Sequence, residues 1–589
     1  MLNNLIKDFQ PTLFSSLKKY NKETFMADLM SGLIVGIVAL PLAIAFGISS
    51  GVSPEKGIIT AIVAGFIISF LGGSTVQIGG PTGAFIVIVY GIVEKFGVQG
   101  LAIATVMAGI MLMVIGFLKL GSVIKFIPYP IVVGFTSGIA LTIFSTQIKD
   151  LFGLSIEKVP SDFINKWGVY FQQFSTINWW AAAIGILSIV IIFLTPKFSK
   201  KIPGSLIAII LMTIVVYLLK QNLGVSGIET IGDRFQIKSQ LPQVEPIGFN
   251  IESIRALFPS AFTIAILGAI ESLLSATVAD GVTGAKHNSN MELVAQGAAN
   301  IITPFFGGIP ATGAIARTMT NINNGGRTPV AGLIHSVVLL FILLFLGDLT
   351  KHIPMACLAG VLVVVAYNMS EWRTFRSLAK QSKSTMAVLL TTFSLTVIFD
   401  LTIAIEVGLL LAIFLFLKRL TESTEVTVAT GEVNISNEAE SHAGDVQEEV
   451  LHLPKGVEVY EISGPFFFGI ANKFDDVMRE LGNHPNIRII RMRKVPFIDS
   501  TGLNNLENLC KNSQNEKIHI ILSGVNDKVR ASLYKSKVPN IVGEENICSH
   551  IHAAVERATV LSEELEERKT SLRCRFLFYY LCRFNFKRN

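Results

Sequence analysis

Two short strings rich in glycine and proline interrupt long apolar stretches of this chain, and they constrain its fold more than any other feature. Residues 79–85 read Gly-Gly-Pro-Thr-Gly-Ala-Phe, and residues 307–317 read Gly-Gly-Ile-Pro-Ala-Thr-Gly-Ala-Ile-Ala-Arg. Glycine lets the backbone turn freely, and proline fits the first position of a helix, where its missing N–H costs nothing. Each string therefore predicts an extended segment that ends where a helix begins.

Both strings lie within apolar sequence, so the two predicted helices begin inside a membrane and not at its edge. The N-terminus of a helix carries unpaired N–H groups and roughly half a positive charge. Two such ends that meet near the membrane midplane form an anion site that requires no lysine. Paired interrupted segments in the two halves of a chain indicate the binding site of a secondary transporter.

The composition agrees with a membrane protein. Of the 589 residues, 51% are hydrophobic and only 16% are charged, which is typical of chains that cross a bilayer repeatedly. The net charge of +6 is spread among loops, which favours positive-inside topology over a nucleic-acid partner. The five cysteines have neither metal-like nor disulfide-like spacing, and we expect them to be reduced. No cleavable signal peptide is visible at the N-terminus.

Fourteen apolar segments are predicted between residues 25 and 420, seven in each half. The first seven cover roughly 28–48, 54–71, 81–93, 100–118, 122–147, 177–195 and 203–220. The second seven cover roughly 258–279, 291–305, 311–322, 328–346, 353–369, 384–399 and 401–417. The interrupted helix is third in each set. Because an odd number of spans inverts the second repeat, the two interrupted helices approach the midplane from opposite sides.

Loop charges predict the orientation in the cell (inner) membrane. If the N-terminal segment 1–24 is cytoplasmic, most basic loop residues also fall on the cytoplasmic side, as the positive-inside rule requires. These residues are Lys119, Lys125, Lys197, Lys200, Lys201, Arg373, Arg376, Lys380, Lys383, Lys418 and Arg419. We therefore predict that both the N-terminus and the C-terminus are cytoplasmic.

The chain changes character after residue 420. Residues 421–450 are polar and are predicted to form a linker. Residues 451–560 alternate between strand and helix patterns, which predicts a small cytoplasmic α/β domain. The expected strands are 457–462, 487–492 and 518–521, and the expected helices lie near 470–482, 501–512 and 525–535. The apolar run in the tail, 561–589, is too short to span a bilayer and predicts an interfacial anchor or a disordered segment.

Several of these motifs together resemble the SulP (sulfate permease) family. The resemblance rests on the two glycine–proline strings, on residues 39–46 (Ala-Leu-Pro-Leu-Ala-Ile-Ala-Phe) and on residues 327–332 (Arg-Thr-Pro-Val-Ala-Gly). Residues 497–503 (Phe-Ile-Asp-Ser-Thr-Gly-Leu) resemble the signature of a STAS domain, which anti-sigma-factor antagonists share. The resemblance implies an α-helical polytopic membrane protein with seven-plus-seven inverted repeats, a core domain that moves against a gate domain, and usually a homodimer. It also implies an inorganic anion as substrate.

The predicted anion site surrounds the two helix starts. The substrate-binding candidates are Thr82, Gly83, Ala84, Phe85, Thr312, Gly313, Ala314 and Arg317. Arg317 follows the second start within two turns, and an arginine inside a membrane needs a partner or a watery cavity. The resemblance places Arg317 near the anion pocket, and a structural ion pair is the alternative interpretation. The two threonine hydroxyls either face the anion or bond only to the backbone.

Glu271 is predicted to couple transport to a second ion. It lies in apolar sequence and shares a helical face with Gly268 and Ser275. In the sodium-coupled bicarbonate carriers that this sequence resembles, the matching position is typically Asp with a hydroxyl residue four positions later; here Glu271 and Ser275 stand there. Protonated Glu271 leaves about two positive charges in the site, which suits sulfate, whereas ionised Glu271 leaves about one, which suits a monovalent anion or added sodium. We predict H⁺ or Na⁺ as coupling ion, and no metal or other cofactor.

The sequence favours a secondary active transporter that moves an inorganic anion by alternating access. Sulfate is the first choice of substrate, Na⁺-dependent bicarbonate transport is the second, and dicarboxylates follow. A membrane-anchored signalling protein is a further alternative, with Ser500 and Thr501 as regulatory candidates, because the resemblance matches Thr501 to the phosphorylated residue of the antagonists. A helix cap without regulation is the alternative for these two residues. No nucleophile–base pair, metal cluster or phosphate loop is visible, so the sequence predicts neither an enzyme nor an ATP-driven pump.

Overall fold

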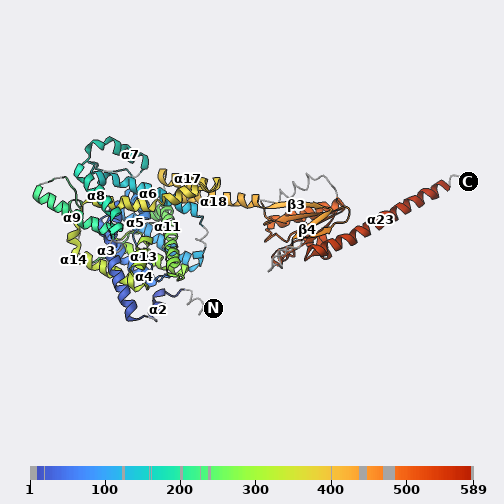
Figure 1. The fold of residues 1–589 in the computed structure, drawn as a ribbon, viewed down its shortest axis with the longest axis horizontal. Coiled ribbons are helices and arrows are strands. Elements are labelled where there is room, and N and C mark those ends of the chain that lie inside the picture. The colour runs from blue at the N-terminus through green and yellow to red at the C-terminus, as the bar shows by residue number, and fades with distance from the viewer. Residues whose placement is uncertain are drawn as a thin grey trace. The chain divides into compact units, whose positions relative to one another are not determined.

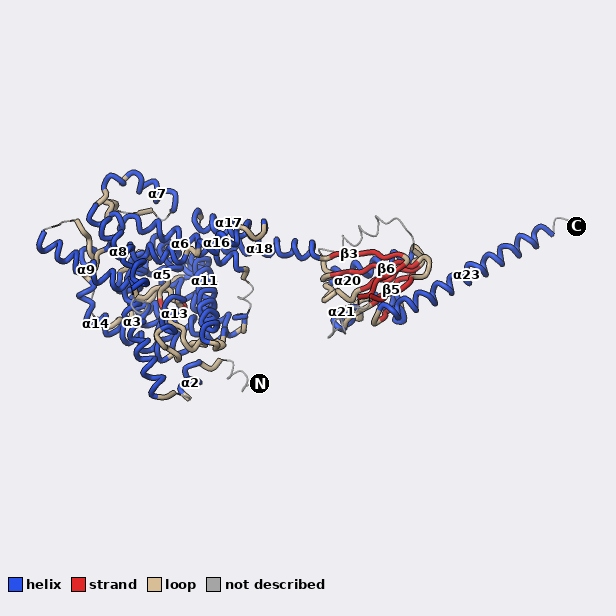
Figure 2. Tube along the Cα trace, viewed as in Figure 1, coloured by secondary structure: helices blue, strands red, loops and turns tan. Residues whose placement is uncertain are grey.

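A computed structural model describes residues 9–585, apart from 19, 123–126, 158, 161, 199–202, 224, 226, 236–239, 400, 437–447 and 469–484. The chain divides into two compact units, Met1–Ala412 and Ile413–Asn589 (Figure 1). The first unit is helical apart from two very short strands, and the second contains the extended sheet (Figure 2).

The helices of the first unit, of which the last, α18, continues into the second unit, follow the chain in this order. They are α2 (Thr12–Leu17), α3 (Lys22–Ser49), α4 (Pro54–Leu71), η1 (Gly83–Phe85), α5 (Ile86–Phe117), α6 (Tyr129–Phe152), α7 (Phe163–Gln172), α8 (Trp179–Phe198), α9 (Gly204–Leu223), α10 (Ile231–Arg234), α11 (Ile251–Thr283), α12 (Ser289–Ile302), η5 (Thr303–Phe306), α13 (Ile315–Asn323), α14 (Val330–Thr350), α15 (Met355–Met369), α16 (Trp372–Ala379), α17 (Lys383–Ile398) and α18 (Leu401–Ser423).

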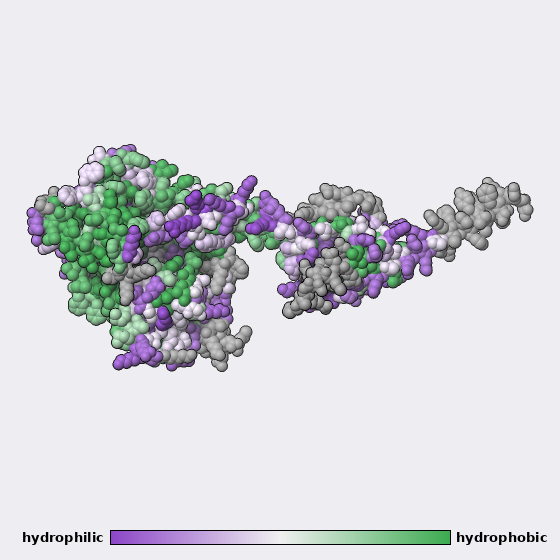
Figure 3. Space-filling view, in the orientation of Figure 1, coloured by the Kyte–Doolittle hydropathy of each residue, from purple (hydrophilic) through white to green (hydrophobic). Residues whose placement is uncertain are grey.

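Within the described residues, nine helices are long and apolar enough to cross a membrane. Hydrophobic side chains accordingly gather on the outside of this unit, over α8, α9 and α14 in the view of Figure 3. A helix that is apolar all round belongs in a protein core or in a bilayer. The prediction of a polytopic helical membrane protein is confirmed.

Each of the fourteen predicted apolar segments corresponds to a helix or to part of one. The third and fourth segments are the two parts of α5, which turns at Gly97, where φ is +68°. That value lies in the left-handed region that favours glycine. The third segment of the second repeat is the short helix α13. Three further helices, α7, α10 and α16, lie in connections outside the predicted segments.

The helices pack into two groups. One group consists of α3, α4, α5, α11, α12, α13 and α14, which contact mainly one another. The other consists of α6, α8, α9, α15 and α17. Each group draws on both repeats, as expected for a core and a gate built from inverted repeats. We call them the core group and the gate group.

The two glycine–proline strings meet at the centre of the core group. Strand β1 (Gly79–Gly80) pairs antiparallel with β2 (Thr312–Gly313), with Gly79 opposite Gly313 and Gly80 opposite Thr312. The antiparallel pairing is the arrangement that two inverted repeats require. The prediction that each string is an extended segment followed by a helix is confirmed.

Polar side chains from neighbouring helices bond to the backbone around this crossing. Asn300 of α12 donates to the carbonyl of Ala311 (2.7 Å) and accepts from its N–H (2.9 Å). Glu292, two turns earlier on α12, accepts from the N–H groups of Gly73 (2.9 Å) and Ser74 (3.2 Å). Irregular backbone at membrane depth is tolerated only where its polar groups find partners inside the protein. These buried side chains therefore make the crossing possible.

The second unit is an α/β domain with a mixed sheet. The sheet has the order β3-β6-β7-β8-β9, with β3 antiparallel to β6 and the remaining pairs parallel. Its strands are β3 (Glu425–Thr430), β6 (Val457–Ser463), β7 (Ile487–Arg491), β8 (His519–Ser523) and β9 (Ile547–Cys548). Helices α20 (Ser500–Asn515) and α21 (Asp527–Leu533) contribute to one apolar core, and α23 (Ile551–Asn585) contributes to another. The three predicted strands and the helices near 501–512 and 525–535 are confirmed.

The interpretation of 421–450 as a linker requires correction. Its described part contains β3, which is an edge strand of the main sheet, and β4 (Glu432–Ser436), which pairs with β5 (Glu448–His452). The outward positions of β3 are polar, so the segment has the composition of a linker, yet Val426 and Val428 pack against the core. The predicted helix near 470–482 lies outside the described residues. The tail from residue 561 continues helix α23 as far as Asn585, in place of a disordered segment.

Candidate functional site

A cavity of about 340 Å³ lies between the core group and the gate group. On the core side it is lined by the residues at the two helix starts, together with α3 and α11. On the gate side it is lined by α6 and α15. The polar or charged residues of its wall are Thr82, Tyr129, Thr136, Glu271, Arg317, Asn368 and Glu371. The cavity reaches the surface at the exposed Tyr129, where α6 begins.

The first residues of the two helices line the cavity. Gly83 and Ala84 open the first helix, and Ala314, Ile315 and Ala316 surround the start of the second. The first N–H groups of a helix have no partner within that helix. Both ends therefore contribute partial positive charge to one space, roughly half a charge each.

Arg317 adds a full positive charge beside these helix ends. It is 2% exposed, and its guanidinium reaches from the second repeat to the backbone of the first. Nη2 donates to the carbonyl of Pro81, and Nη1 donates to the carbonyl of Gly79 at 3.5 Å. Carbonyl oxygens are neutral, and among the described residues Arg317 has no carboxylate partner. The alternative of a structural ion pair is therefore unsupported among the described residues.

Glu271 lies on the same cavity wall as Arg317. Its carboxylate accepts a hydrogen bond from the hydroxyl of Thr82 at 3.1 Å, and among the described residues it forms no ion pair. Because Thr82 precedes the first turn of the first helix, this bond connects the carboxylate to the N-terminal end of that helix.

Of the remaining predicted site residues, four do not line the cavity. Phe85 is buried beside Gly268 behind the wall. Thr312 is fully buried and donates to the carbonyl of Gly268 at 2.8 Å, while Gly313 lies against Gln77. Ser275 is buried and bonds to Thr318 (3.3 Å). Thr82, Gly83, Ala84, Ala314, Arg317 and Glu271 do line it.

The sequence did not predict the residues of the gate-side cavity wall or the buried polar residues of α12 that bond to the crossing. Phe135, Met369 and Val132 on the gate wall belong to apolar segments whose lipid-facing and cavity-facing residues are alike in type. Thr136 and Asn368 could have indicated the gate wall, because they are polar residues inside apolar segments. Glu292 was likewise visible as a charge in an apolar segment, and it is fully buried. Intramembrane charges of this kind mark functional or structural sites.

In the second unit, the side chains of Ser500 and Thr501 are exposed at the start of α20. Asp499 caps this helix by accepting from the N–H of Gly502 at 2.7 Å. The cap is therefore made by Asp499 and leaves both hydroxyls free of that role, so the regulatory role of Ser500 and Thr501 stays a prediction.

Two helices that start at an antiparallel crossing inside a membrane bundle, with a cavity between two helix groups, define a membrane transporter of the inverted-repeat class. Comparison with protein families agrees. Residues 25–392 match the model of the sulfate permease family, and residues 450–558 match the STAS domain. The chain belongs to the sulfate permease family and carries a C-terminal STAS domain.

The chain is similar over most of its length to individual members of this family. It is 38% identical over 535 residues to the Bacillus subtilis (strain 168) protein described as "Putative sulfate transporter YvdB", covering 90% of this chain and 98% of the relative. It is 29% identical over 505 residues to the bicarbonate transporter BicA of Picosynechococcus sp., covering 82% of this chain and 86% of BicA.

Solved structures show the same fold. The murine anion transporter Slc26a9 in the inward-facing state superposes with a TM-score of 0.83 and 19% sequence identity, over 95% of each chain. The transmembrane domain of BicA, a cyanobacterial bicarbonate transporter, matches 67% of this chain and 99% of that domain, with a TM-score of 0.59 and 29% identity. The predicted fold class, a helical transporter domain followed by a STAS domain, is confirmed.

Proposed function

We propose that this protein is a secondary active transporter that moves sulfate across the membrane by alternating access, coupled to protons through Glu271. The observation that carries the proposal is the placement of Arg317 and both helix starts on one cavity, without a carboxylate partner for Arg317 among the described residues. The two helix ends and Arg317 together supply about two positive charges. Sulfate carries the matching charge when Glu271 is neutral.

The substrate-binding residues in this proposal are those that line the cavity at the helix starts, with Arg317 as the main charged contact. Phe85, Thr312 and Gly313 act from behind the wall by holding the crossing in shape. Glu271 binds the coupling ion. The hydroxyl of Thr82 connects the carboxylate of Glu271 to the first helix start, so that ion binding changes the hydrogen bond there. Ser275 supports α13 through Thr318.

The arrangement in the cell membrane follows the loop charges. Both termini face the cytoplasm, so the cavity opens to the cytoplasm at Tyr129, and the STAS domain is cytoplasmic. The protein works as a homodimer, as the resemblance to its family implies.

Sodium-dependent bicarbonate transport is the second candidate. It is favoured by the similarity to BicA, which is a bicarbonate transporter. An ionised Glu271 would leave about one net positive charge in the cavity, which suits a monovalent anion or a bound sodium ion. The two candidate functions therefore differ in the protonation state of Glu271. An experiment can distinguish them by whether uptake depends on protons or on sodium.

The test is uptake into proteoliposomes that contain the purified full-length protein. Labelled sulfate and labelled bicarbonate are compared under an inward proton gradient, an inward sodium gradient or neither. We expect sulfate uptake that the proton gradient accelerates at least about tenfold, which corresponds to about 1.4 kcal/mol. In Glu271→Gln this acceleration disappears, because the side chain can no longer exchange a proton.

The matched control is Glu406→Gln on α18, because Glu406 is a second glutamate in the apolar region, is exposed, and does not line the cavity. We expect its uptake to equal that of the wild type. Sodium-dependent bicarbonate uptake without sulfate uptake would overturn the first proposal in favour of the second. Absence of uptake of both anions would overturn both.

A further inference from the structure

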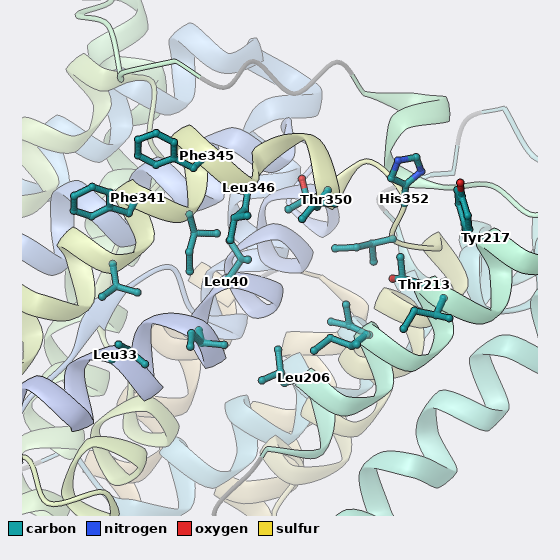
Figure 4. A pocket seen from close by; sticks show the side chains of 18 of the residues that line it. Leu33, Leu40, Leu206, Thr213, Tyr217, Phe341, Phe345, Leu346, Thr350 and His352 are labelled. Carbon is teal, nitrogen blue, oxygen red and sulfur yellow. The ribbon is translucent and has the colours of Figure 1, made fainter.

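A second, larger hollow lies on the membrane-facing side of the first unit. Its volume is about 1180 Å³, above the roughly 300–1,000 Å³ of ordinary ligand pockets. Helices α3 and α14 of the core group form one wall, and α9 of the gate group forms the other. We call it the lateral groove; its shaft is apolar and includes Leu33, Leu40, Leu206, Phe341 and Phe345 (Figure 4). Ile210 also lines the shaft.

The lateral groove has one polar end. Tyr217, Thr350 and His352 lie together there, and the rings of Tyr217 and His352 meet edge to face at 5.9 Å (Figure 4). The hydroxyl of Tyr217 accepts from Gln221 at 2.9 Å and keeps its own proton to donate. This end lies where α9 and α14 finish, which is at a membrane surface. Tyrosine is enriched at that depth because one part of its ring is apolar and the other polar.

The charged side chains near the polar end are paired. Lys351 bonds to Asp348, and Lys220 bonds to Asp233 at 3.0 Å. The end therefore offers hydrogen-bond donors without a strong net charge. Such an end suits the ester and phosphate oxygens of a phospholipid, which accept hydrogen bonds.

The length of the shaft also fits a lipid tail. From Leu206 to Leu218 the groove follows α9 over a length of about 18 Å at 1.5 Å per residue. This is more than half of the roughly 30 Å hydrocarbon core of a bilayer. A tail that starts at the polar end therefore reaches past the midplane within the groove.

A second copy of the chain fits the lateral groove less well than a lipid. The two walls belong to different helix groups, which shift against each other in the proposed transport cycle. A rigid protein surface that matched the groove in one state would lose its fit in the other, and packed interfaces are sensitive to such shifts. A flexible acyl chain adapts to both.

We infer that the lateral groove is a binding site for a membrane phospholipid. One of its acyl chains lies along α9 between the core group and the gate group, and its head group bonds to Tyr217 and His352. The site is separate from the anion cavity, and lipid binding in the resting protein does not depend on which anion is carried.

The test places the photoreactive residue p-benzoylphenylalanine at position 345 in the full-length protein. Phe345 lines the groove and is 74% exposed. The protein is purified in detergent, which removes loosely associated lipid, then irradiated and weighed by intact-mass spectrometry. We expect an added mass of one phospholipid. The control is the same residue at position 258 on α11, where the native Phe258 is 54% exposed and lies outside the groove.

A pair of groove variants completes the test. Ile210→Trp fills the shaft and should lower the lipid adduct at position 345 at least about tenfold. Ile186→Trp on α8 should leave it unchanged, because Ile186 is 51% exposed against 53% for Ile210 but lies outside the groove. Equal lipid adducts at positions 345 and 258, or none at position 345, would overturn the proposal even if Ile210→Trp failed to fold. A product of twice the chain mass from position 345 would show that a second copy occupies the groove.

Discussion

Arg317 belongs to the second repeat, but its hydrogen bonds go to the first. Its guanidinium holds the carbonyls of Pro81 and Gly79, which flank the turn into the first helix. A close approach is possible because residue 80 is glycine: a Cβ there would collide with the guanidinium. Gly80 also has φ of +148°, at the edge of the region that side chains avoid. One side chain therefore supplies charge and fixes the spacing of the two helix starts.

We expect Arg317→Met to abolish anion uptake and Arg317→Lys to retain part of it. Methionine removes the charge and leaves two buried carbonyls without a donor, at a cost of about 1–3 kcal/mol each. Lysine keeps the charge but has no planar fork for both carbonyls. Uptake rates and thermal unfolding of the purified variants would be compared. Wild-type uptake by Arg317→Met would show that the arginine is only structural.

The two threonines of the glycine–proline strings are expected to have different roles, Thr82 in coupling and Thr312 in stability. Thr82 donates to Glu271, whereas Thr312 donates to a backbone carbonyl behind the wall. We expect Thr82→Val to change the pH dependence of uptake with little effect on thermal stability. Thr312→Val should lower stability by about 1 kcal/mol and leave the pH dependence unchanged. If both variants shifted the pH dependence equally, the assignment of Thr82 to coupling would be wrong.

Individual cavity residues can be predicted from the sequence where their chemical type differs from that of the neighbouring residues. Glu271 and Arg317 stand out because charges are rare in apolar segments. Phe135 and Met369 do not, because an apolar residue that faces a cavity has the same type as one that faces lipid. Which of two threonines faces the cavity depends on a fraction of a helix turn, and boundaries drawn from one sequence are less exact than that.

Helix α12 supports the crossing of β1 and β2 through its polar side chains. Glu292, Gln296 and Asn300 recur every four residues, so they lie on one face, and all three are fully or almost fully buried. Gln296 donates to Glu292 at 2.9 Å, which joins the stripe into one network. The stripe holds the segments before β1 and around Ala311 at a fixed separation.

We expect Asn300→Leu to destabilise the protein and to lower the transport rate. The leucine is similar in size but leaves the N–H and carbonyl of Ala311 without partners, at about 1–3 kcal/mol for each group. Thermal unfolding and uptake are the measurements. Asn324→Leu is the control, since that side chain bonds only one carbonyl near a helix end; an equal loss there would contradict a special role for Asn300.

Helix α7 contains a buried lysine outside the membrane-spanning segments. Lys166 is 2% exposed, and burial lowers the pKa of its amine to about 8, although Asp162 and Glu94 oppose the shift. In an unfolded chain a lysine titrates near 10.4. Between about pH 8 and pH 10 the unfolded chain therefore binds one proton more than the folded one, and the free energy of unfolding rises with pH.

We expect Lys166→Met to stabilise the protein below pH 8 by up to about 3 kcal/mol, because a buried charge is removed. The gain should shrink as the pH approaches 10, where the folded wild type already holds a neutral amine. Thermal unfolding from pH 7 to pH 10 measures both. A constant difference between variant and wild type across this range would exclude titration of Lys166 as the cause.

Elements with strong periodicity were predictable, and elements with mixed composition were not. The apolar segments and the strands β6, β7 and β8 follow directly from residue pattern. Strand β3 has glutamate and threonine on its outer face, so its composition resembled a linker, and only pairing with β6 makes it a strand. Short helices such as α7 and α16 are stabilised by packing against other helices. A local sequence pattern holds no information about such contacts, so these helices were not predicted.

Within the first unit, hydrogen bonds connect the core group to the gate side at the end away from Tyr129. There the hydroxyl of Tyr90, in the core group, donates to the carbonyl of Val159 at 2.9 Å. Gln147, in the gate group, donates to Ser49 of the core group at 3.2 Å. The second bond joins the two groups directly, and the first joins the core group to the connection that follows α6. Alternating access requires both bonds to break.

We expect a short reversible cross-link between Ser49→Cys and Gln147→Cys to stop uptake, and reduction to restore it. The control joins Ser188→Cys to the native Cys357, which contact each other within the gate group, and should leave uptake unchanged. The other native cysteines are replaced in both cases. Full uptake with the Ser49–Gln147 pair linked would show that the groups need not separate there.

The pairing of β1 with β2 also has a consequence for biosynthesis. Gly79 pairs with Gly313, which the ribosome adds more than 230 residues later. At about 5–20 residues per second, the first strand waits roughly 10–50 s for its partner. During that time its backbone lies at membrane depth without the strand that completes it. The first repeat must therefore be sheltered, by the insertion machinery or by its own water-filled cleft, until the second repeat arrives.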